Sequence, residues 1–169
     1  LGLEELAWHK GSVLGALPDC PQPWQKRFES RLLAALQGFD PNRLVHVEAE
    51  SRKIGSLQLP TALIESMRAG ECVNIEASQA ARVDFLLRDY DYFLKAPDWL
   101  IARLQSLRQL QSNETLLRWR AQIGDGRWRE LVGELLTLHY DPLYQRSQQK
   151  NYAGFAATLN FFFNDMATT

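Results

Sequence analysis

The stretch from Val45 to Pro60 constrains the fold of this chain most, because a β-branched apolar run there meets a dense group of charges. Such a run, followed by polar residues and a glycine, is typical of a buried parallel strand that delivers side chains to the ligand edge of an open α/β sheet. The sequence therefore predicts a strand at 44–49 and a site just after it.

A helix at 59–67 and a second strand at 72–77 complete a predicted βαβ unit, whose right-handed crossover makes the two strands parallel. Both predicted strands end in acid, Glu48 and Glu50 at the end of the first and Glu76 at the end of the second, so we expect their carboxylates at one sheet edge. There they could hold Mg²⁺, act as a general base or anchor an arginine of the following loop. Ordinary strand-end ion pairs would give the same pattern.

The rest of the chain is predicted to be mostly helical. Residues 1–8 read as the end of a strand or a short helix, and apolar residues at helical spacing predict helices at 24–37, 79–94, 97–110, 114–123 and 128–138. The Asp141-Pro142 step disfavours further helix, so Tyr140, Asp141 and Tyr144 are expected at an element end, before a last strand at 152–163. The fold class is therefore α/β, with a helix-rich C-terminal half.

Composition excludes several kinds of protein. With a net charge of −1 the chain has no long-range field for nucleic acid, so any RNA contact must be local. Its two cysteines and three histidines show neither a disulfide framework nor zinc-ligand spacing, and no metal site is predicted from them. No apolar run is long enough to cross a membrane, and we expect a cytoplasmic protein.

The loop from His9 to Gly15 is basic and punctuated by glycine. Gly11, Ser12 and the basic side chain of Lys10 are parts from which phosphate contacts are built, although the sequence Gly-x-x-x-x-Gly-Lys-Ser/Thr of a Walker A loop is absent. A solvated turn is the plain alternative.

Three phrases and a fourth between them resemble one family, the selenophosphate-dependent tRNA 2-selenouridine synthases. They are Leu-Ala-Trp-His-Lys-Gly-Ser-Val-Leu-Gly at 6–15, Gln-Pro-Trp-Gln-Lys-Arg-Phe-Glu at 22–29, Glu-Ser-Arg-Lys-Ile-Gly at 50–55 and His-Tyr-Asp-Pro-Leu-Tyr-Gln-Arg-Ser at 139–147. Each phrase is weak by itself, but their order makes the resemblance specific, and it covers nearly the whole chain.

The resemblance implies a rhodanese-like domain followed by a P-loop α/β domain similar to small kinases, and this chain looks like the C-terminal part of the second. The family converts wobble 2-thiouridine of tRNA to 2-selenouridine through an S-geranyl intermediate, with geranyl diphosphate and selenophosphate as co-substrates. Its partners would be the tRNA anticodon loop and the upstream rhodanese and P-loop segments. No cofactor is expected within the chain, although Mg²⁺ is possible.

The resemblance also implies which residues form the site. Glu50 and Arg52 are the expected catalytic pair, and Tyr140, Asp141 and Tyr144 are candidates for RNA binding. For the tyrosines, core packing is the alternative. Substrate or phosphate binding is expected of residues that supply cations, hydroxyls or close backbone approach: His9, Lys10, Gly11, Ser12, Ser51, Gly55 and Arg82.

Departures from the family pattern leave other readings open. Without a Walker A sequence, and with neither Cys20 nor Cys72 in a rhodanese context, we expect this chain alone to be inactive and to bind diphosphate weakly or not at all. A non-catalytic RNA-binding or interdomain docking module and a nucleotide kinase-like P-loop protein are the alternatives.

Overall fold

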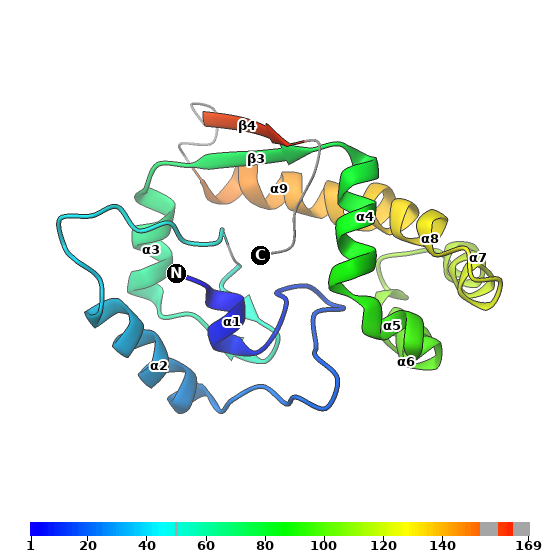
Figure 1. Ribbon diagram of the computed structural model, residues 1–169, viewed down its shortest axis with the longest axis horizontal. Helices are drawn as coiled ribbons and strands as arrows, with labels where there is room; N and C mark the ends of the chain where they lie inside the picture. Colours follow the sequence, from blue (N-terminus) through cyan, green and yellow to red (C-terminus); the bar gives the residue numbers. More distant parts are fainter. Residues whose placement is uncertain (50, 153–158, 164–169) are drawn as a thin grey trace. The chain divides into compact units, whose positions relative to one another are not determined.

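The computed structural model describes residues 1–49, 51–152 and 159–163, and it divides the chain into two units, Leu1–Met67 and Arg68–Thr169 (Figure 1). The first unit contains α1 (Leu3–Ala7), α2 (Gln25–Gln37), the hairpin strands β1 (Lys53–Ile54) and β2 (Leu57–Gln58), and most of α3 (Thr61–Ala69). The helices predicted at 24–37 and 59–67 are therefore confirmed within about two residues.

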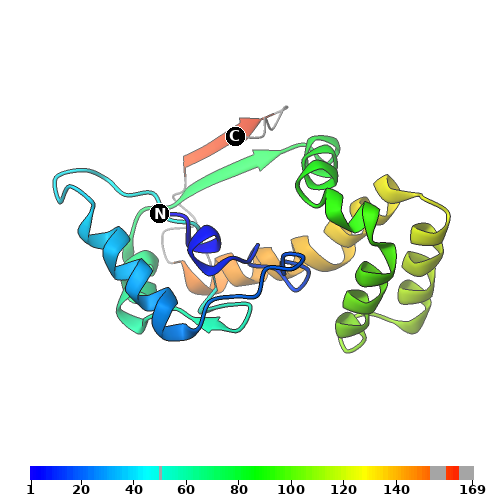
Figure 2. The same cartoon turned by 60° about the horizontal axis from the view of Figure 1, so that its bottom comes forward.

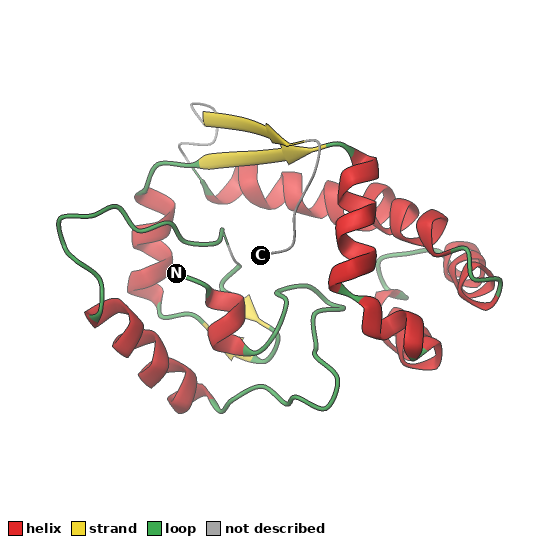
Figure 3. Ribbon diagram, viewed as in Figure 1, coloured by secondary structure: helices red, strands yellow, loops and turns green. Residues whose placement is uncertain are grey.

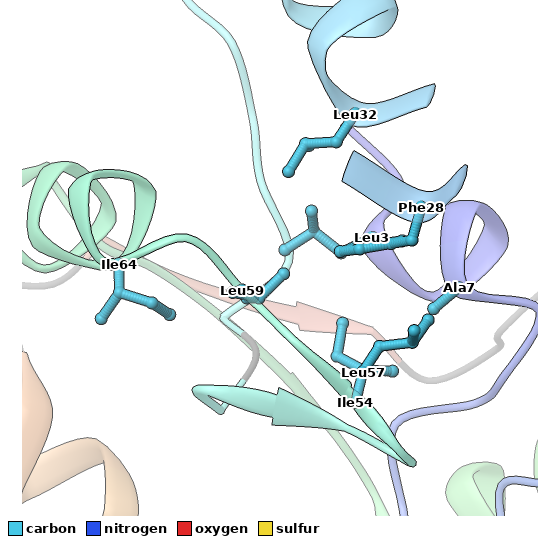
Figure 4. Close-up of a cluster of buried hydrophobic side chains, with 8 residues drawn as sticks. All are labelled: Leu3, Ala7, Phe28, Leu32, Ile54, Leu57, Leu59 and Ile64. Carbon is cyan, nitrogen blue, oxygen red and sulfur yellow. The ribbon is translucent and has the colours of Figure 1, made fainter. Parts of the chain in front are cut away.

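The core of the first unit joins all of these elements. Phe28 and Leu32 lie four residues apart on α2, so they share one face and point at the hairpin and at α1 (Figure 4). The whole cluster is at most 5% exposed and consists of Leu3, Ala7, Phe28, Leu32, Ile54, Leu57, Leu59 and Ile64. Burial of this apolar face holds two very short strands in place, which could not be stable as an isolated hairpin.

The strand predicted at 44–49 is wrong. Residues 44–49 pair with no described strand, and Leu44 is 91% exposed. The Glu48 carboxylate instead accepts hydrogen bonds from the backbone N–H groups of Leu3 (2.7 Å) and Glu4 (3.0 Å), at the start of α1. A helix start has unpaired donors and a partial positive charge, so this acid serves as a remote cap rather than as a strand end.

The second unit is mostly helical (Figure 3). The side chains of Ser78 and Ser112 accept hydrogen bonds from the N–H groups of Ala81 and Thr115, and so cap α4 and α7. Among described residues no helix is both long and apolar enough to span a membrane. The elements are β3 (Val73–Ala77), α4 (Gln79–Asp89), α5 (Asp91–Lys95), α6 (Pro97–Leu104), η1 (Gln105–Leu107), α7 (Asn113–Gly124), α8 (Trp128–Leu135), η2 (Leu136–Tyr140), α9 (Asp141–Asn151) and β4 (Leu159–Phe163).

The parallel strand pair of this unit is not the predicted one. β3 pairs in parallel with β4, with Ile75 opposite Phe161, so the predicted βαβ unit and its shared acidic edge are wrong (Figure 2). The strand expected at 152–163 is confirmed for 159–163, and 153–158 lie outside the described residues. Ile75 is 66% exposed and Phe162 is 63% exposed. Large apolar side chains on a parallel pair are normally covered, because such sheets are buried on both faces.

The helix predicted to end before Pro142 continues instead. The chain passes from α8 through the π-helix η2 into α9, and both Tyr140 and Asp141 keep right-handed helical angles. Pro142 lies in the first turn of α9. Proline is tolerated in a first turn because the N–H groups there have no acceptor within the helix, so the absence of one costs little. The wider π turn therefore carries the chain past a step that usually stops a helix. Tyr140, Asp141 and Tyr144 consequently lie inside a helical run, not at its end.

Candidate functional site

The first predicted site segment, the loop from His9 onward, is closed by its own hydrogen bonds. The Lys10 N–H donates to the Gly15 carbonyl (2.8 Å), the Ser12 N–H to Lys10 (2.6 Å) and the Gly15 N–H to Ser12 (2.9 Å). His9, only 7% exposed, pairs with Ala16 in an isolated antiparallel bridge. These N–H groups are directed inward, so they do not cradle an anion.

Two other groups of this loop serve the turn. Gly11 has φ +63°, a conformation that favours glycine, and the Ser12 hydroxyl accepts a hydrogen bond from the Leu14 N–H (3.2 Å). Any phosphate contact here would therefore come from side chains, above all from Lys10, and that role stays a prediction.

The second predicted segment forms the entry to the β1–β2 hairpin. Glu50 lies outside the described residues, and the Ser51 hydroxyl donates to the Lys53 carbonyl (2.6 Å) while accepting from the Lys53 N–H (3.2 Å). Arg52 is exposed, and its backbone carbonyl accepts a hydrogen bond from the Leu59 N–H (3.0 Å). Ser51 thus shapes the turn, and the Arg52 side chain stands in water, where it could meet an anionic ligand.

The hairpin is fastened by Gln22, which is not among the predicted site residues. Gln22 Nε2 donates to the carbonyls of Ala7 (3.2 Å) and Ile54 (3.0 Å), while its Oε1 accepts from the N–H (2.7 Å) and the hydroxyl (3.0 Å) of Ser56. A Cβ on Gly55, which has φ +58°, would lie 2.1 Å from Gln22 Oε1. The close approach at Gly55 is therefore made by Gln22.

A second glutamine of the same sequence phrase acts in the same way. Gln25 donates to the carbonyl of Gln58 (2.8 Å) and accepts from its N–H (2.9 Å), which satisfies both backbone groups of this β2 residue. It also donates to Glu29 (2.8 Å). Two glutamines three residues apart, next to a buried Phe28, are the signal that could have indicated this clamp, but side-chain amides bonded to a distant backbone leave no periodic pattern in sequence.

In the second unit the structure brings together two residues that were predicted to have different roles. Arg82 on α4 and Asp141 on α9 form a two-pronged ion pair, with distances of 2.5 Å (Nη2 to Oδ1) and 3.1 Å (Nη1 to Oδ2). Both side chains are about one-third exposed, at 32% and 34%. Parallel N–H···O bonds fix the orientation of a guanidinium, and an anionic ligand would have to displace Asp141 to use the same donors.

The π-helix η2 places further polar and aromatic groups beside this pair. His139 is 2% exposed, its Nδ1 lies 3.4 Å from Gln111 Nε2, and burial lowers the pKa of its imidazole. Its ring meets that of Tyr140 edge to face at 4.8 Å, whereas Tyr144 on α9 is 55% exposed. The contact with His139 covers part of the Tyr140 ring, so Tyr144 has the more accessible ring for stacking. Single π turns occur frequently at functional sites.

An open groove of about 550 Å³ lies between α4, α8 and η2. Gln79 crosses it and donates to the Gly133 carbonyl (3.4 Å) and the Thr137 hydroxyl (3.2 Å), and Arg129 pairs with Asp84. Gln79 and Arg129 are not among the predicted site residues. The lining consists of Gln79, Ala80, Val83, Arg129, Glu130, Gly133, Glu134, Thr137 and Leu138.

Glu134, at the wall of this groove, belongs to a tight polar network with α7. Its carboxylate accepts from Arg118 Nε (2.8 Å), Trp119 Nε1 (3.1 Å) and Gln122 Nε2 (2.8 Å). Burial by itself raises the pKa of Glu134, but the hydrogen bonds from Arg118, Gln122 and Trp119 outweigh it and hold that pKa below its ordinary value. This acid stays ionised near neutral pH and fixes α7 against α8.

The predicted site residues thus fall into two groups. Arg82, Tyr140, Asp141 and Tyr144 gather on α4, η2 and α9 of the second unit, while the phosphate candidates of 9–12 and 51–55 belong to the first unit. Within the described part of the chain, no three histidine, cysteine or acidic side chains are arranged to hold a metal ion.

Comparison with known proteins identifies the family. Residues 1–113 match the sequence model described as the tRNA 2-selenouridine synthase AAA domain. The chain therefore belongs to the tRNA 2-selenouridine synthase family, which confirms the resemblance seen in its sequence. No solved structure matches the chain.

Curated relatives extend the match into the C-terminal half. The tRNA 2-selenouridine synthase of Cupriavidus pinatubonensis is 34% identical over 166 residues, which cover 96% of this chain and 44% of that protein. That of Alcanivorax borkumensis is 31% identical over 85% of this chain and 47% of its own length, and that of Nitrosomonas europaea is 37% identical over 64% and 28%. The chain therefore spans less than half the length of these three relatives.

Proposed function

We propose that this chain is the C-terminal portion of a P-loop α/β domain in a cytoplasmic transferase that converts wobble 2-thiouridine of tRNA to 2-selenouridine. The observation that carries the proposal is the family match over residues 1–113, with relatives that cover nearly the whole chain. Geranyl diphosphate, selenophosphate and the tRNA anticodon loop are the proposed substrates of the complete protein, and Mg²⁺ is a possible companion of the diphosphate.

The proposed reaction has two substitutions. The sulfur at C2 of 2-thiouridine attacks the first carbon of geranyl diphosphate, so that a C–S bond forms and diphosphate leaves. The selenium of selenophosphate then attacks C2 and geranylthiolate leaves, after which water cleaves the Se–P bond and releases phosphate. Alkylation of the sulfur turns a poor leaving group into a better one, and cationic side chains neutralise the diphosphate.

Within this scheme we assign the exposed Arg52 and the half-buried Lys10 to phosphate groups, and Glu50 to the orientation of Arg52. Tyr144 offers a half-exposed ring for an unstacked base, and Tyr140 lies beside it in the same helical run. Arg82 and Asp141 are ion-paired, so we propose that they position η2 and α9, with Arg82 released to an anion only if Asp141 is displaced.

The upstream rhodanese and P-loop segments are the proposed partners of the exposed sheet. Val73, Ile75, Phe161, Phe162 and Phe163 are each 46% to 66% exposed, which is unusual for a parallel strand pair. Strands and helices from the remainder of a complete synthase would cover these side chains, and this requirement supports a multi-segment enzyme.

A non-catalytic RNA-binding or docking module is the second candidate, because Ser51 and Gly55 serve the geometry of the hairpin. Arg52→Ala in the complete protein separates the two, with Arg43→Ala as a matched control at another exposed arginine of the same unit. We expect Arg52→Ala to abolish selenium incorporation with tRNA affinity within about twofold of wild type, since the lost group acts on the chemistry. Loss of tRNA binding together with chemistry would support docking, and full activity would exclude a catalytic role.

A further inference from the structure

Two arginines of α2 lie against one tryptophan. The guanidinium carbons of Arg27 and Arg31 are 5.2 Å and 5.3 Å from the centre of the Trp8 ring system, within the range of cation–π attraction. The arginines are four residues apart and so share one face of the helix. Trp8 follows α1 directly and has a left-handed backbone, with φ 52°, which turns the chain at this point.

The two arginines of this cluster lack a carboxylate partner among the residues that the structure describes. In the described residues neither Arg27 nor Arg31 forms an ion pair, and Glu29, the acid nearest to them in sequence, accepts a hydrogen bond from Gln25 instead. Arg31 donates one hydrogen bond to the Leu6 carbonyl (3.3 Å), which anchors it at the end of α1. Arg27 is exposed, so the N–H donors of its guanidinium group are accessible to solvent.

This geometry suits a polyanionic strand better than a small buried anion. Arg27 is exposed and Arg31 is half-buried against α1, so the two guanidinium groups do not enclose a small anion as a diphosphate site would. An indole limits the motion of both side chains and lowers the entropy lost when they meet phosphate. With a net charge of −1 for the chain, attraction of RNA depends on such local clusters.

We propose that Arg27 and Arg31, held on Trp8, form a contact for the sugar–phosphate backbone of tRNA. The proposal rests on the proposed function, which makes tRNA the partner, and it adds a docking surface outside the predicted site residues. The arginines contribute affinity without reading sequence, because phosphate contacts position an RNA and base contacts specify it. Trp8 is the platform that orients them.

Salt-dependent tRNA binding by the complete protein tests this surface. The probe is a transcript of a tRNA with uridine at the wobble position, and the variants are Arg27→Gln and, as a matched control, Arg120→Gln at an exposed arginine of α7. We expect Arg27→Gln to weaken binding about 3- to 10-fold at low salt and to reduce the slope of log affinity against log salt by about 0.7 to 1, as loss of one phosphate contact requires. Arg120→Gln should change neither quantity.

Trp8→Leu separates positioning from charge. It keeps both arginines but removes their platform, so we expect weaker binding with a salt slope close to that of wild type. An Arg27→Gln protein with unchanged affinity and slope overturns the proposal, as does one that changes only the KM for geranyl diphosphate. If the wild-type protein does not bind the transcript, both this surface and the proposed function fail. Thermal melts of each variant establish that it is folded.

Discussion

Gly55 tests whether the hairpin glycine serves the fold or a ligand. In Gly55→Ala the new Cβ would lie 2.1 Å from Gln22 Oε1, and φ +58° is a left-handed conformation that costs a non-glycine residue about 1–2 kcal/mol. The Gln22 amide must therefore leave its position. Its four hydrogen bonds, at about 0.5–1.5 kcal/mol each and reduced where Ser56 is exposed, sum to about 1.5–3 kcal/mol.

The expected losses in free energy of unfolding of the first unit follow from these terms. Gln22→Ala should lose about 1.5–3 kcal/mol and Gly55→Ala about 2.5–5 kcal/mol, because the latter suffers both the backbone strain and the loss of the amide contacts. The double variant should lose no more than Gly55→Ala, since the amide is removed only once. The two changes therefore couple by about 1.5–3 kcal/mol, as expected for residues in direct contact.

Hydrogen exchange along a urea titration, read on peptides that cover 51–60, measures these differences for the first unit. Gly126→Ala is the matched control, because Gly126 has a similar φ of +68° but its added Cβ would approach nothing closer than Trp128 Nε1 at 4.0 Å. Read on peptides around position 126 in the second unit, this variant should lose only the backbone strain, about 1–2 kcal/mol, and Gln22→Ala should leave that loss unchanged. Fully additive losses at Gly55 and Gln22 would refute the structural argument, and an unchanged stability with lost ligand affinity would support a phosphate role for Gly55.

Three further predictions concern the second unit. A double-mutant cycle of Arg82→Gln and Asp141→Asn, measured by denaturant unfolding, should give a coupling free energy of about 0.5–1.5 kcal/mol, because the ion pair is bidentate but one-third exposed. A coupling of zero would mean that the ion pair does not hold η2 in place. The pKa of Glu134 is depressed in the fold, so this acid stabilises the fold above its ordinary pKa of 4.5, and the contribution is lost as pH falls through the lower, folded pKa. The pKa of His139 is also depressed, so the free energy of unfolding should fall as pH drops below 6.5. Unfolding measured against pH should show both losses, and Glu134→Gln should remove the first and His139→Gln the second. We proposed that other segments of the complete protein bury Ile75, so Ile75→Thr, which keeps β-branching, should cost that protein about 1–2 kcal/mol. Leu117→Thr, at a 67%-exposed helix position, should cost less than about 1 kcal/mol, and equal small losses would show that the sheet is not covered.

Much of the fold follows from local sequence signals. The helix that carries Phe28 and Leu32, and the parts of the predicted strands at 73–77 and 159–163, were predicted because each depends on residues that are close in sequence. The family resemblance also came from the sequence alone, through the order of four short phrases.

The tertiary structure decided how these pieces are used. A β-branched run at 44–49 has the composition of a strand, but pairing requires a neighbour, and in the described residues the segment has none and instead brings Glu48 to α1. The Asp141-Pro142 step breaks most helices, but the π turn of η2 and the bond between Arg82 and Asp141 hold it within one.

The predicted site shows the same division. Sequence determined the residue types of the predicted site, from Lys10 to Tyr144, because their chemistry belongs to single side chains. Only the fold decided that the close neighbour of Gly55 is Gln22, that Arg82 pairs with Asp141, and that Arg27 and Arg31 meet at Trp8. Each of these contacts joins residues from different elements, and their free energy depends on distances that no local pattern of residues encodes.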